Sequence, residues 1–310
     1  MYFRTIVIGA IAIVILGIYY QNYFISKHHN ERRAWVTLLG TEDYFPGVLA
    51  LVRSLKRANS IYPLVVMMTK DVCSDEAQQL ILNEGCSIRF IEDFYPTSET
   101  VYSYPHFFHA WKKLRAFEMV DICDKCIFLD ADIILLQNID ELFDLNDNIS
   151  FAAVQTCTCN LKKVSTYPES WKPENCFYTR EQYSNNTTHD NSDANVMFNA
   201  GLFLFRPNLT IFQQMSEALN TWDLTEFKFA EQDFLNKFYH DTWTRIPFIY
   251  HGMRGFSKSH PHLWDLSKLK TIHYIQAKPW QKSDEGNVEY ETINRLWWEA
   301  YEWRSEKKEK

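Results

Sequence analysis

The sequence predicts an α/β fold built on a mixed, mostly parallel sheet. Short apolar runs recur along the chain and alternate with segments whose apolar residues follow helical spacing. Near-continuous apolar strands are typical of parallel sheets that are buried on both faces. The 310 residues, 46% of them hydrophobic, allow one large or two modest domains, and we expect one domain over residues 34–303.

The first half of this domain alternates regularly. We expect strands at residues 34–39, 64–68, 87–91 and 125–130, with helices at 48–58, 74–83 and 111–121. Ser74 and Asp75 are good caps for the second helix, and Gly85 can end it.

The second half is less regular. A short acidic helix at 139–145 and a strand at 151–154 precede a long polar insert, residues 155–194. A loop of this length inside a domain is usually functional or disordered. The domain ends with an interrupted apolar strand at 196–205, helices at 209–220 and 231–238, a strand at 271–275 and an aromatic amphipathic helix at 294–303; a charged tail follows at 304–310.

The amino terminus differs from the rest of the chain. Residues 5–20 carry no charge, and together with residues 21–25 they can cross a bilayer as a helix, which takes about 20 residues. Since no small-x-small cleavage site follows the run, an uncleaved signal anchor at 5–25 is favoured over a cleaved signal peptide. Residues 1–4 would then be a cytoplasmic tail and residues 26–33 a stem. The flanking positive charges do not decide the orientation.

Glycosylation triplets favour a secretory compartment. Asn-x-Ser/Thr occurs at Asn148, Asn185, Asn186 and Asn208. We therefore expect a single-pass type II protein of a secretory membrane, in the Golgi, with a lumenal catalytic domain. The net charge of −7 and the scattered basic residues exclude a nucleic-acid partner.

Seven cysteines leave several arrangements open. Either Cys157 or Cys159 can pair with Cys176 and close the insert. Cys123 and Cys126 have the spacing of a redox motif, but the apolar strand around Cys126 favours a buried thiol. A zinc site formed by Cys123, Cys126, Cys157 and Cys159 is the alternative.

Two carboxylates interrupt an apolar region that reads CIFLDADIILL. Asp130 and Asp132 come directly after a predicted strand, and ligands of open α/β sheets bind beyond the carboxyl ends of the strands. Like charges this close require a raised pKa or a cation, and oxygen ligands suit a hard divalent ion. The apolar runs on both sides argue against the alternative of a solvated turn.

Seven blocks resemble, in order, those of glycosyltransferase family eight, which includes glycogenin and bacterial lipopolysaccharide galactosyltransferases. They read TLLGTEDYFPGVLALVRSLK, KKLRAFE, FLDADIILLQNIDELF, FNAGLFLFRP, EQDFLN, PFIYH and HYIQAKPW, and they cover residues 35–280 except the insert. The resemblance implies a GT-A fold, a UDP-sugar donor, Mn²⁺ (or Mg²⁺) and transfer with retention of anomeric configuration.

The resemblance also implies roles for individual residues. The metal ligands would be Asp130, Asp132 and His273, and the donor-binding residues would be Leu38, Thr41, Tyr44, Lys113, Ala131, Asn199, Ala200, Gly201 and Lys278. Residues 38–44 would hold uracil and ribose, residues 199–201 would line the sugar pocket, and Lys278 would hold the diphosphate. The catalytic candidates that face the anomeric carbon would be Gln232, Glu231 and Asp233.

The chain departs from the family pattern in two places. Gln276 stands where the family often has glycine, three residues after His273, and Lys278 follows His273 by five residues instead of six. Beyond PFIY the chain reads HGMRGFSKSHPH, which contains no tyrosine and argues against self-priming.

We therefore expect an Mn²⁺-dependent retaining enzyme that moves a hexose from a UDP-sugar to an external glycan, glycoprotein or glycolipid hydroxyl. The alternatives are a glycogenin-like polysaccharide-priming transferase and an inactive UDP- or sugar-binding scaffold. A homodimer is also compatible with the sequence. The identity of the sugar stays open among glucose, galactose, N-acetylglucosamine, xylose and glucuronic acid.

Overall fold

The computed structural model describes residues 31–97, 102–183, 196–281 and 288–304. The expected anchor at 5–25, the tail at 1–4, most of the stem and the charged tail from residue 305 lie outside these ranges. Among the described residues, no helix has the length and apolar character needed to span a bilayer.

The larger sheet has seven strands in the order β3-β2-β1-β4-β7-β6-β8. These strands are β1 (Arg33–Leu39), β2 (Leu64–Met68), β3 (Ser87–Phe90), β4 (Lys125–Leu129), β6 (Phe151–Gln155), β7 (Phe198–Phe205) and β8 (Thr244–Ile246). Strand β7 runs antiparallel to β4 and β6, whereas the other four pairings are parallel. The expected α/β fold with a mixed, mostly parallel sheet is confirmed.

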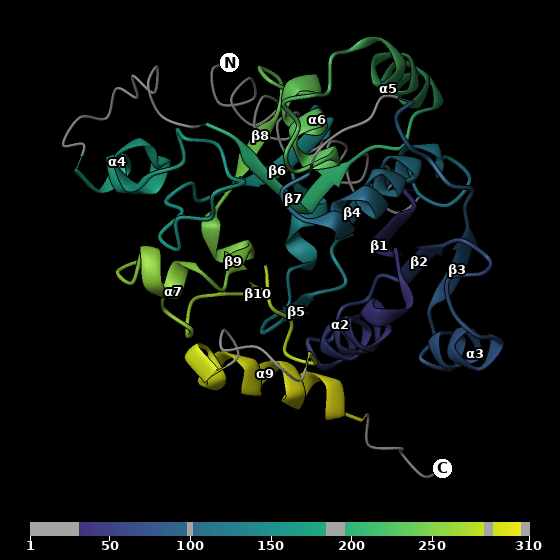
Figure 1. The fold of residues 1–310 in the computed structure, drawn as a ribbon. Helices are drawn as coiled ribbons and strands as arrows, with labels where there is room; N and C mark the ends of the chain where they lie inside the picture. The colour runs from purple at the N-terminus through teal and green to yellow at the C-terminus, as the bar shows by residue number, and fades with distance from the viewer. Residues whose placement is uncertain (1–30, 98–101, 184–195, 282–287, 305–310) are drawn as a thin grey trace, which may run out of the picture.

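A smaller sheet, which we did not predict, lies between the larger sheet and α9 (Figure 1). It contains β5 (Ile133–Leu135), β10 (Thr271–His273) and β9 (Gly252–Met253), with β10 antiparallel to β5 and parallel to β9. Strands of two or three residues are too short for an alternating pattern to reveal. Their pairing nevertheless brings two distant parts of the chain together next to Asp132.

Helices cover both faces of the larger sheet. The α-helices of the described residues are α2 (Phe45–Arg57), α3 (Asp75–Asn83), α4 (Phe177–Tyr183), α5 (Leu209–Thr221), α6 (Glu231–Phe238), α7 (Phe256–Ser259) and α9 (Glu291–Glu302). The 3-10 helices are η1 (Glu42–Tyr44), η2 (Pro105–Glu118), η3 (Asp140–Asp144), η4 (Pro173–Asn175) and η5 (Phe248–Tyr250). One core layer packs β-strand side chains against α2, α3 and η3, and the other packs them against η2, α5 and α6.

Strand β1 shows why both layers form. Trp35 packs on the α2 side and Val36 on the η2 side, and both are fully buried. Successive strand residues point to opposite faces, so an unbroken apolar run requires cover on both sides. Burial of each such side chain contributes about 1.5–3 kcal/mol.

Two local expectations are corrected. The helix expected at 111–121 is the 3-10 helix η2, because Trp111, Leu114 and Phe117 recur every three residues and a 3-10 helix places them on one buried face. Cys126 is not a buried thiol, since it forms a disulfide with Cys123.

The proposed four-cysteine zinc site is also wrong, because its members are not neighbours. Cys157 and Cys159 lie beside Cys176 and His260. No disulfide joins Cys157 or Cys159 to Cys176 in the structure, where all three are free thiols.

Candidate active site

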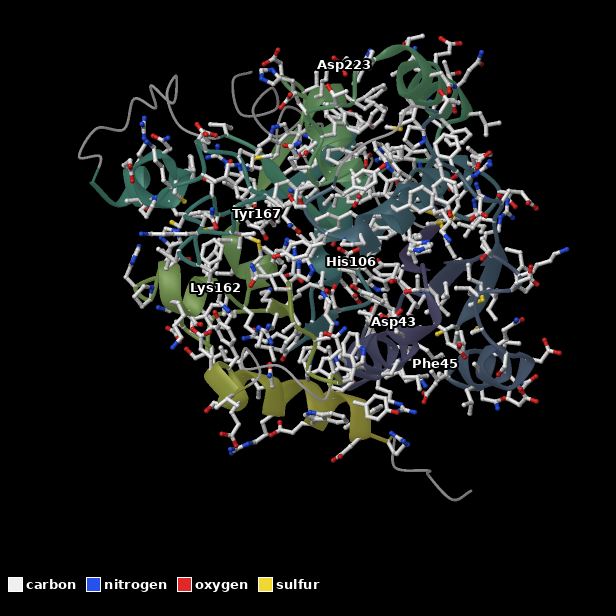
Figure 2. All side chains as sticks on the ribbon, in the orientation of Figure 1. Asp43, Phe45, His106, Lys162, Tyr167 and Asp223 are labelled. Carbon is white, nitrogen blue, oxygen red and sulfur yellow. A yellow bond between two sulfur atoms is a disulfide. The ribbon has the colours of Figure 1, made fainter. Side chains whose placement is uncertain are left out.

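A cavity of about 480 Å³ opens beyond the carboxyl ends of β1 and β4, and its volume is typical of small-molecule sites. It collects predicted site residues that are far apart in the sequence. They are Leu38, Thr41, Tyr44, Lys113, Asp130, Ala131, Asp132, Asn199, Ala200, Gly201, Glu231, Gln232, His273 and Lys278. Figure 2 shows Lys162, Tyr167, His106 and Asp43 around this central region, between the larger sheet and α9.

The three predicted metal ligands converge. Asp132 Oδ1 lies 3.0 Å and Asp130 Oδ2 lies 3.7 Å from His273 Nε2. A turn after β4, closed by the hydrogen bond from Ile133 N to Asp130 O (3.0 Å), brings the two carboxylates to one side. In the smaller sheet, His273 is paired with Ile133, so the imidazole necessarily lies beside Asp132.

A second histidine, missed from the sequence, orients the first. His251 Nε2 and His273 Nδ1 are 2.8 Å apart, and both rings are buried. Burial and the neighbouring His273 hold the pKa of His251 well below its ordinary value, so His251 is neutral. When Nδ1 of His273 donates to this neutral ring, Nε2 presents a lone pair to the carboxylates, as a metal-bound histidine requires.

Lys113 joins two carboxylates on the opposite wall. Its Nζ lies 2.7 Å from Asp130 Oδ1 and 2.7 Å from Glu231 Oε1. Burial by itself lowers the pKa of Lys113, but the two carboxylates raise it above its ordinary value. Burial raises the pKa of Glu231, and its Oε2 is buried without a hydrogen-bond partner among the described residues. That oxygen is an acceptor available to a ligand.

Lys278 lies on the other side of Asp132. Its ammonium group hydrogen-bonds to Asp132 Oδ2 and to Tyr274 O, the latter at 3.1 Å. It also lies 5.5 Å above the ring of Tyr44. Although burial raises the pKa of Asp132, Lys278 and His273 lower it well below its ordinary value, so the group is a carboxylate.

The strand end around Asn199 positions Gln232. The Oε1 atom of Gln232 accepts hydrogen bonds from Asn199 Nδ2 (2.9 Å) and Ala200 N (3.2 Å). This leaves the NH₂ group of Gln232 to donate into the cavity. Gly201 lines the cavity, and an added Cβ there would lie 2.5 Å from His273 Cε1. Its missing side chain makes room for the imidazole.

Asp233 departs from the expectation. It is not among the residues that line the cavity. Its Oδ2 accepts a hydrogen bond from Phe229 N at 2.9 Å, which stabilises the turn before α6. Burial raises the pKa of Asp233 to about 6. We therefore leave Asp233 out of the proposed site.

Two strained backbone positions flank the site. Gln276 has φ +65°, which lies in the left-handed region that favours glycine. Its side chain reaches across the cavity wall to Tyr167 OH at 3.4 Å. Ala230, which directly precedes Glu231, has φ 49°. Strain of this kind is common where a fold holds functional side chains in place.

The insert supplies an aromatic wall that sequence reasoning did not identify. Tyr167 and Trp171 line the cavity together with Phe229. Trp171 stacks on Phe229 with ring centroids 4.7 Å apart, and Tyr167 meets both rings edge-on at 5.0–5.2 Å. The sequence feature that could have indicated this wall is the occurrence of Tyr167, Pro168 and Trp171 close together in an otherwise polar insert.

Comparison with known proteins agrees with this geometry. The family described as "Glycosyl transferase family 8" matches residues 35–284. Galactinol synthase 3 of Arabidopsis thaliana is 36% identical over 287 residues, which are 89% of this chain and 83% of the relative. Galactinol synthase 2 of Solanum lycopersicum is 37% identical over 279 residues, 87% of this chain and 80% of the relative.

Solved structures share the fold at lower identity. The bifunctional glycosyltransferase WbbM has a TM-score of 0.61 at 19% identity, over 88% of this chain and 50% of WbbM. The galactosyltransferase LgtC, in complex with donor and acceptor sugar analogs, has a TM-score of 0.52 at 16% identity, over 85% of this chain and 95% of LgtC. The GT-A arrangement and the expected enzyme class, a UDP-sugar glycosyltransferase, are confirmed: the chain belongs to glycosyl transferase family 8.

Proposed function

We propose that this protein transfers galactose from UDP-galactose to a hydroxyl of an inositol-like cyclic polyol, with a divalent metal and with retention of anomeric configuration. The observation that carries the proposal is the convergence of Asp130, Asp132 and His273 with two buried lysines in one cavity. The galactosyl and polyol assignments rest on the likeness to galactinol synthases.

The donor has a defined path through the cavity in this proposal. Uracil and ribose lie at the end of β1, near Leu38, Thr41 and Tyr44. Tyr44 offers a ring face there, and Trp280 supports it edge-on at 5.9 Å. The backbone at Ala131 is held close by α2, because a Cβ on Gly47 would meet Ala131 O at 2.4 Å.

The residues fit a divalent cation. Three carboxylates, Asp130, Asp132 and Glu231, face only two ammonium groups, Lys113 and Lys278, among the described neighbours. A diphosphate adds further negative charge to a buried site, which is costly without a cation. Carboxylates with one imidazole suit Mn²⁺, and Mg²⁺ is the runner-up. When bound, the ion neutralises the charge that develops on the departing diphosphate.

The protein's own side chains position the reacting groups. Lys278 moves its hydrogen bond from Asp132 to a phosphate oxygen and stabilises the leaving group. The NH₂ group of Gln232 and the free oxygen of Glu231 contact the sugar near its anomeric carbon. Retention then follows from attack on the face that the diphosphate leaves, and the acceptor hydroxyl gives its proton to the departing phosphate. We assign no covalent intermediate.

The acceptor lies against the aromatic wall formed by Tyr167, Trp171 and Phe229. Aromatic faces pack on the C–H groups of cyclic polyols and sugars. The same wall also accommodates a terminal sugar of a glycan, which makes a glycan acceptor the second candidate.

The test is a donor and acceptor screen with purified protein and Mn²⁺. We expect UDP release from UDP-galactose that depends on both metal and myo-inositol, with an α-linked galactoside as the product in NMR spectra. Turnover with oligosaccharides but not with inositol would favour the glycan acceptor. Absence of metal-dependent UDP release with all five candidate donors would refute the proposal.

We also propose that residues 5–25 anchor the enzyme in a secretory membrane with the catalytic domain in the lumen. The uncharged run and the Asn-x-Ser/Thr triplets support this. Glycosidase sensitivity of Asn148 or Asn208 in the expressed protein tests it, because N-glycans require lumenal exposure.

A further inference from the structure

A second group of metal-ligand side chains lies at the rim of the cavity, outside the carboxylate cluster. Cys157, Cys159, Cys176 and His260 each offer one ligand atom, and the four atoms lie within 4.8 Å of one another. The proposed transfer uses none of them. Three thiols and one imidazole also differ in chemistry from the carboxylates of the other cluster.

The distances in this group match tetrahedral zinc. The Sγ atoms of Cys157 and Cys159 each lie 3.3 Å from His260 Nε2, and that of Cys176 lies 3.4 Å away. The Sγ atoms of Cys157 and Cys176 are 3.9 Å apart. Zinc bonds of about 2.3 Å to sulfur and about 2.0 Å to nitrogen place tetrahedral ligands about 3.8 Å (S to S) and about 3.5 Å (S to N) apart.

The group is closed, as a structural site should be. Cys159, Cys176 and His260 are 3%, 0% and 1% exposed, and Cys157 is half-buried. Four protein ligands leave no open coordination position, which distinguishes structural from catalytic zinc. Donors outside the ligand set are also present, because Cys157 Sγ lies 3.5 Å from Cys159 N and 3.5 Å from Ser259 Oγ.

The four residues join three parts of the chain that are distant from one another in the sequence. Cys157 and Cys159 follow β6, Cys176 precedes α4, and His260 follows α7. Between Cys159 and Cys176 the regular structure is limited to the short helix η4, and only the two end residues, Cys159 and Cys176, belong to a small satellite core. That segment nevertheless carries Tyr167 and Trp171 of the aromatic wall. A long irregular segment with a small core needs an additional restraint.

We propose that Cys157, Cys159, Cys176 and His260 bind a structural Zn²⁺. The ion would fix both ends of the segment that carries Tyr167 and Trp171 of the aromatic wall. Binding converts the three thiols to thiolates and releases their protons to solvent, while His260 binds as the neutral imidazole through Nε2. Soft thiolates with one imidazole select zinc over the hard cations that suit the carboxylate cluster.

The experiment measures metal content in the full chain, purified under reducing conditions from zinc-supplemented cells. Elemental analysis should find about one zinc per chain in the wild type and in Cys86→Ser, a buried free cysteine outside the group. Cys176→Ser and His260→Ala should lose it. Cobalt-substituted protein should show thiolate charge-transfer and tetrahedral ligand-field absorption, which Asp132→Asn keeps and Cys176→Ser loses.

If the variants fail to fold, measurements on the wild-type protein alone can test the zinc proposal. Removal of zinc by a chelator should speed proteolysis within residues 156–183, and zinc should reverse this. Wild-type protein without zinc and without the cobalt spectrum after reduction would overturn the proposal, as would a disulfide between any two of the three cysteines in unreduced peptides. Because metal content is measured without substrate, failure here leaves the proposed transfer untouched.

Discussion

The described residues contain two clusters of metal-ligand side chains beside one cavity, and the clusters differ in ligand chemistry and in the number of ligands. Asp130, Asp132 and His273 offer hard ligands that face the cavity. The other group offers three soft thiols and one imidazole, and two of the thiols, Cys157 and Cys159, line the same cavity. An open set of three suits an ion that must also bind substrate, whereas a closed set of four suits an ion that holds chain segments together.

Metal removal should have the largest effect, because the two clusters should lose their ions at different rates. Brief dialysis against EDTA should abolish UDP release, and Mn²⁺ should restore it, because three protein ligands leave coordination positions open for the chelator. Zinc in the thiolate group should survive the same treatment. Measurement of turnover and zinc content in the same samples checks this. Simultaneous loss of both would contradict the difference in coordination.

The next largest effect should come from Asp132→Asn. We expect a fall of about 10³-fold in kcat, because the change removes one metal ligand and the partner of Lys278. Loss of the carboxylate beside the buried Lys278 ammonium should also lower the free energy of unfolding by about 3 kcal/mol. Circular dichroism confirms folding, and Asp233→Asn on α6 is the matched control, with unchanged kcat. Equal losses in both variants would show that the effect is structural.

Smaller effects should follow changes that move His273 without removing it. Gly201→Ala forces the imidazole away, and His251→Leu removes the hydrogen-bond partner of its Nδ1. Either change should raise the Mn²⁺ concentration needed for activation by about 10- to 100-fold, the usual range for residues that support a metal ligand. The concentration of Mn²⁺ that gives half-maximal turnover is the readout. His240→Leu, at an exposed histidine, should leave it unchanged.

The smallest effect concerns stability and pH. The pKa of Asp233 is raised from 3.8 to about 6 in the folded chain. Between these values the folded state binds a proton that the unfolded state releases, so this group's contribution to stability falls as pH rises through the window. Asp233→Asn should remove most of that decline and keep the oxygen that accepts from Phe229 N. Tm measured between pH 3.8 and about 6 for the wild type and the variant tests this prediction. A wild-type Tm that rises relative to the variant as pH rises would contradict it.

Sequence reasoning succeeded where the signal was local. The strands at 64–68 and 125–130 and the helix at 231–238 agree with the observed β2, β4 and α6 within a residue. Each is a run whose periodicity and ends are written in neighbouring residues. The position of Asp130 and Asp132 at a strand exit was predictable for the same reason.

Predictions that depended on tertiary contacts were incomplete. His251 could not be identified, because it supports His273 only through the pairing of two very short strands. Asp233 was assigned to the site with its neighbours, yet helical geometry turns it toward the Phe229 backbone. A disulfide of Cys176 with Cys157 or Cys159 was one arrangement that the sequence left open, but His260, distant in sequence, lies among the three free thiols.

The sequence alone determined the layered α/β fold, the order of its main elements and the carboxylates at the end of β4. These depend on hydrophobic burial and backbone geometry, which act over a few residues. Tertiary structure decided which histidine reaches the carboxylates, which acid on α6 faces the cavity and which cysteines meet. Such contacts depend on strand register and on how a long insert closes, and neither is encoded in any single segment.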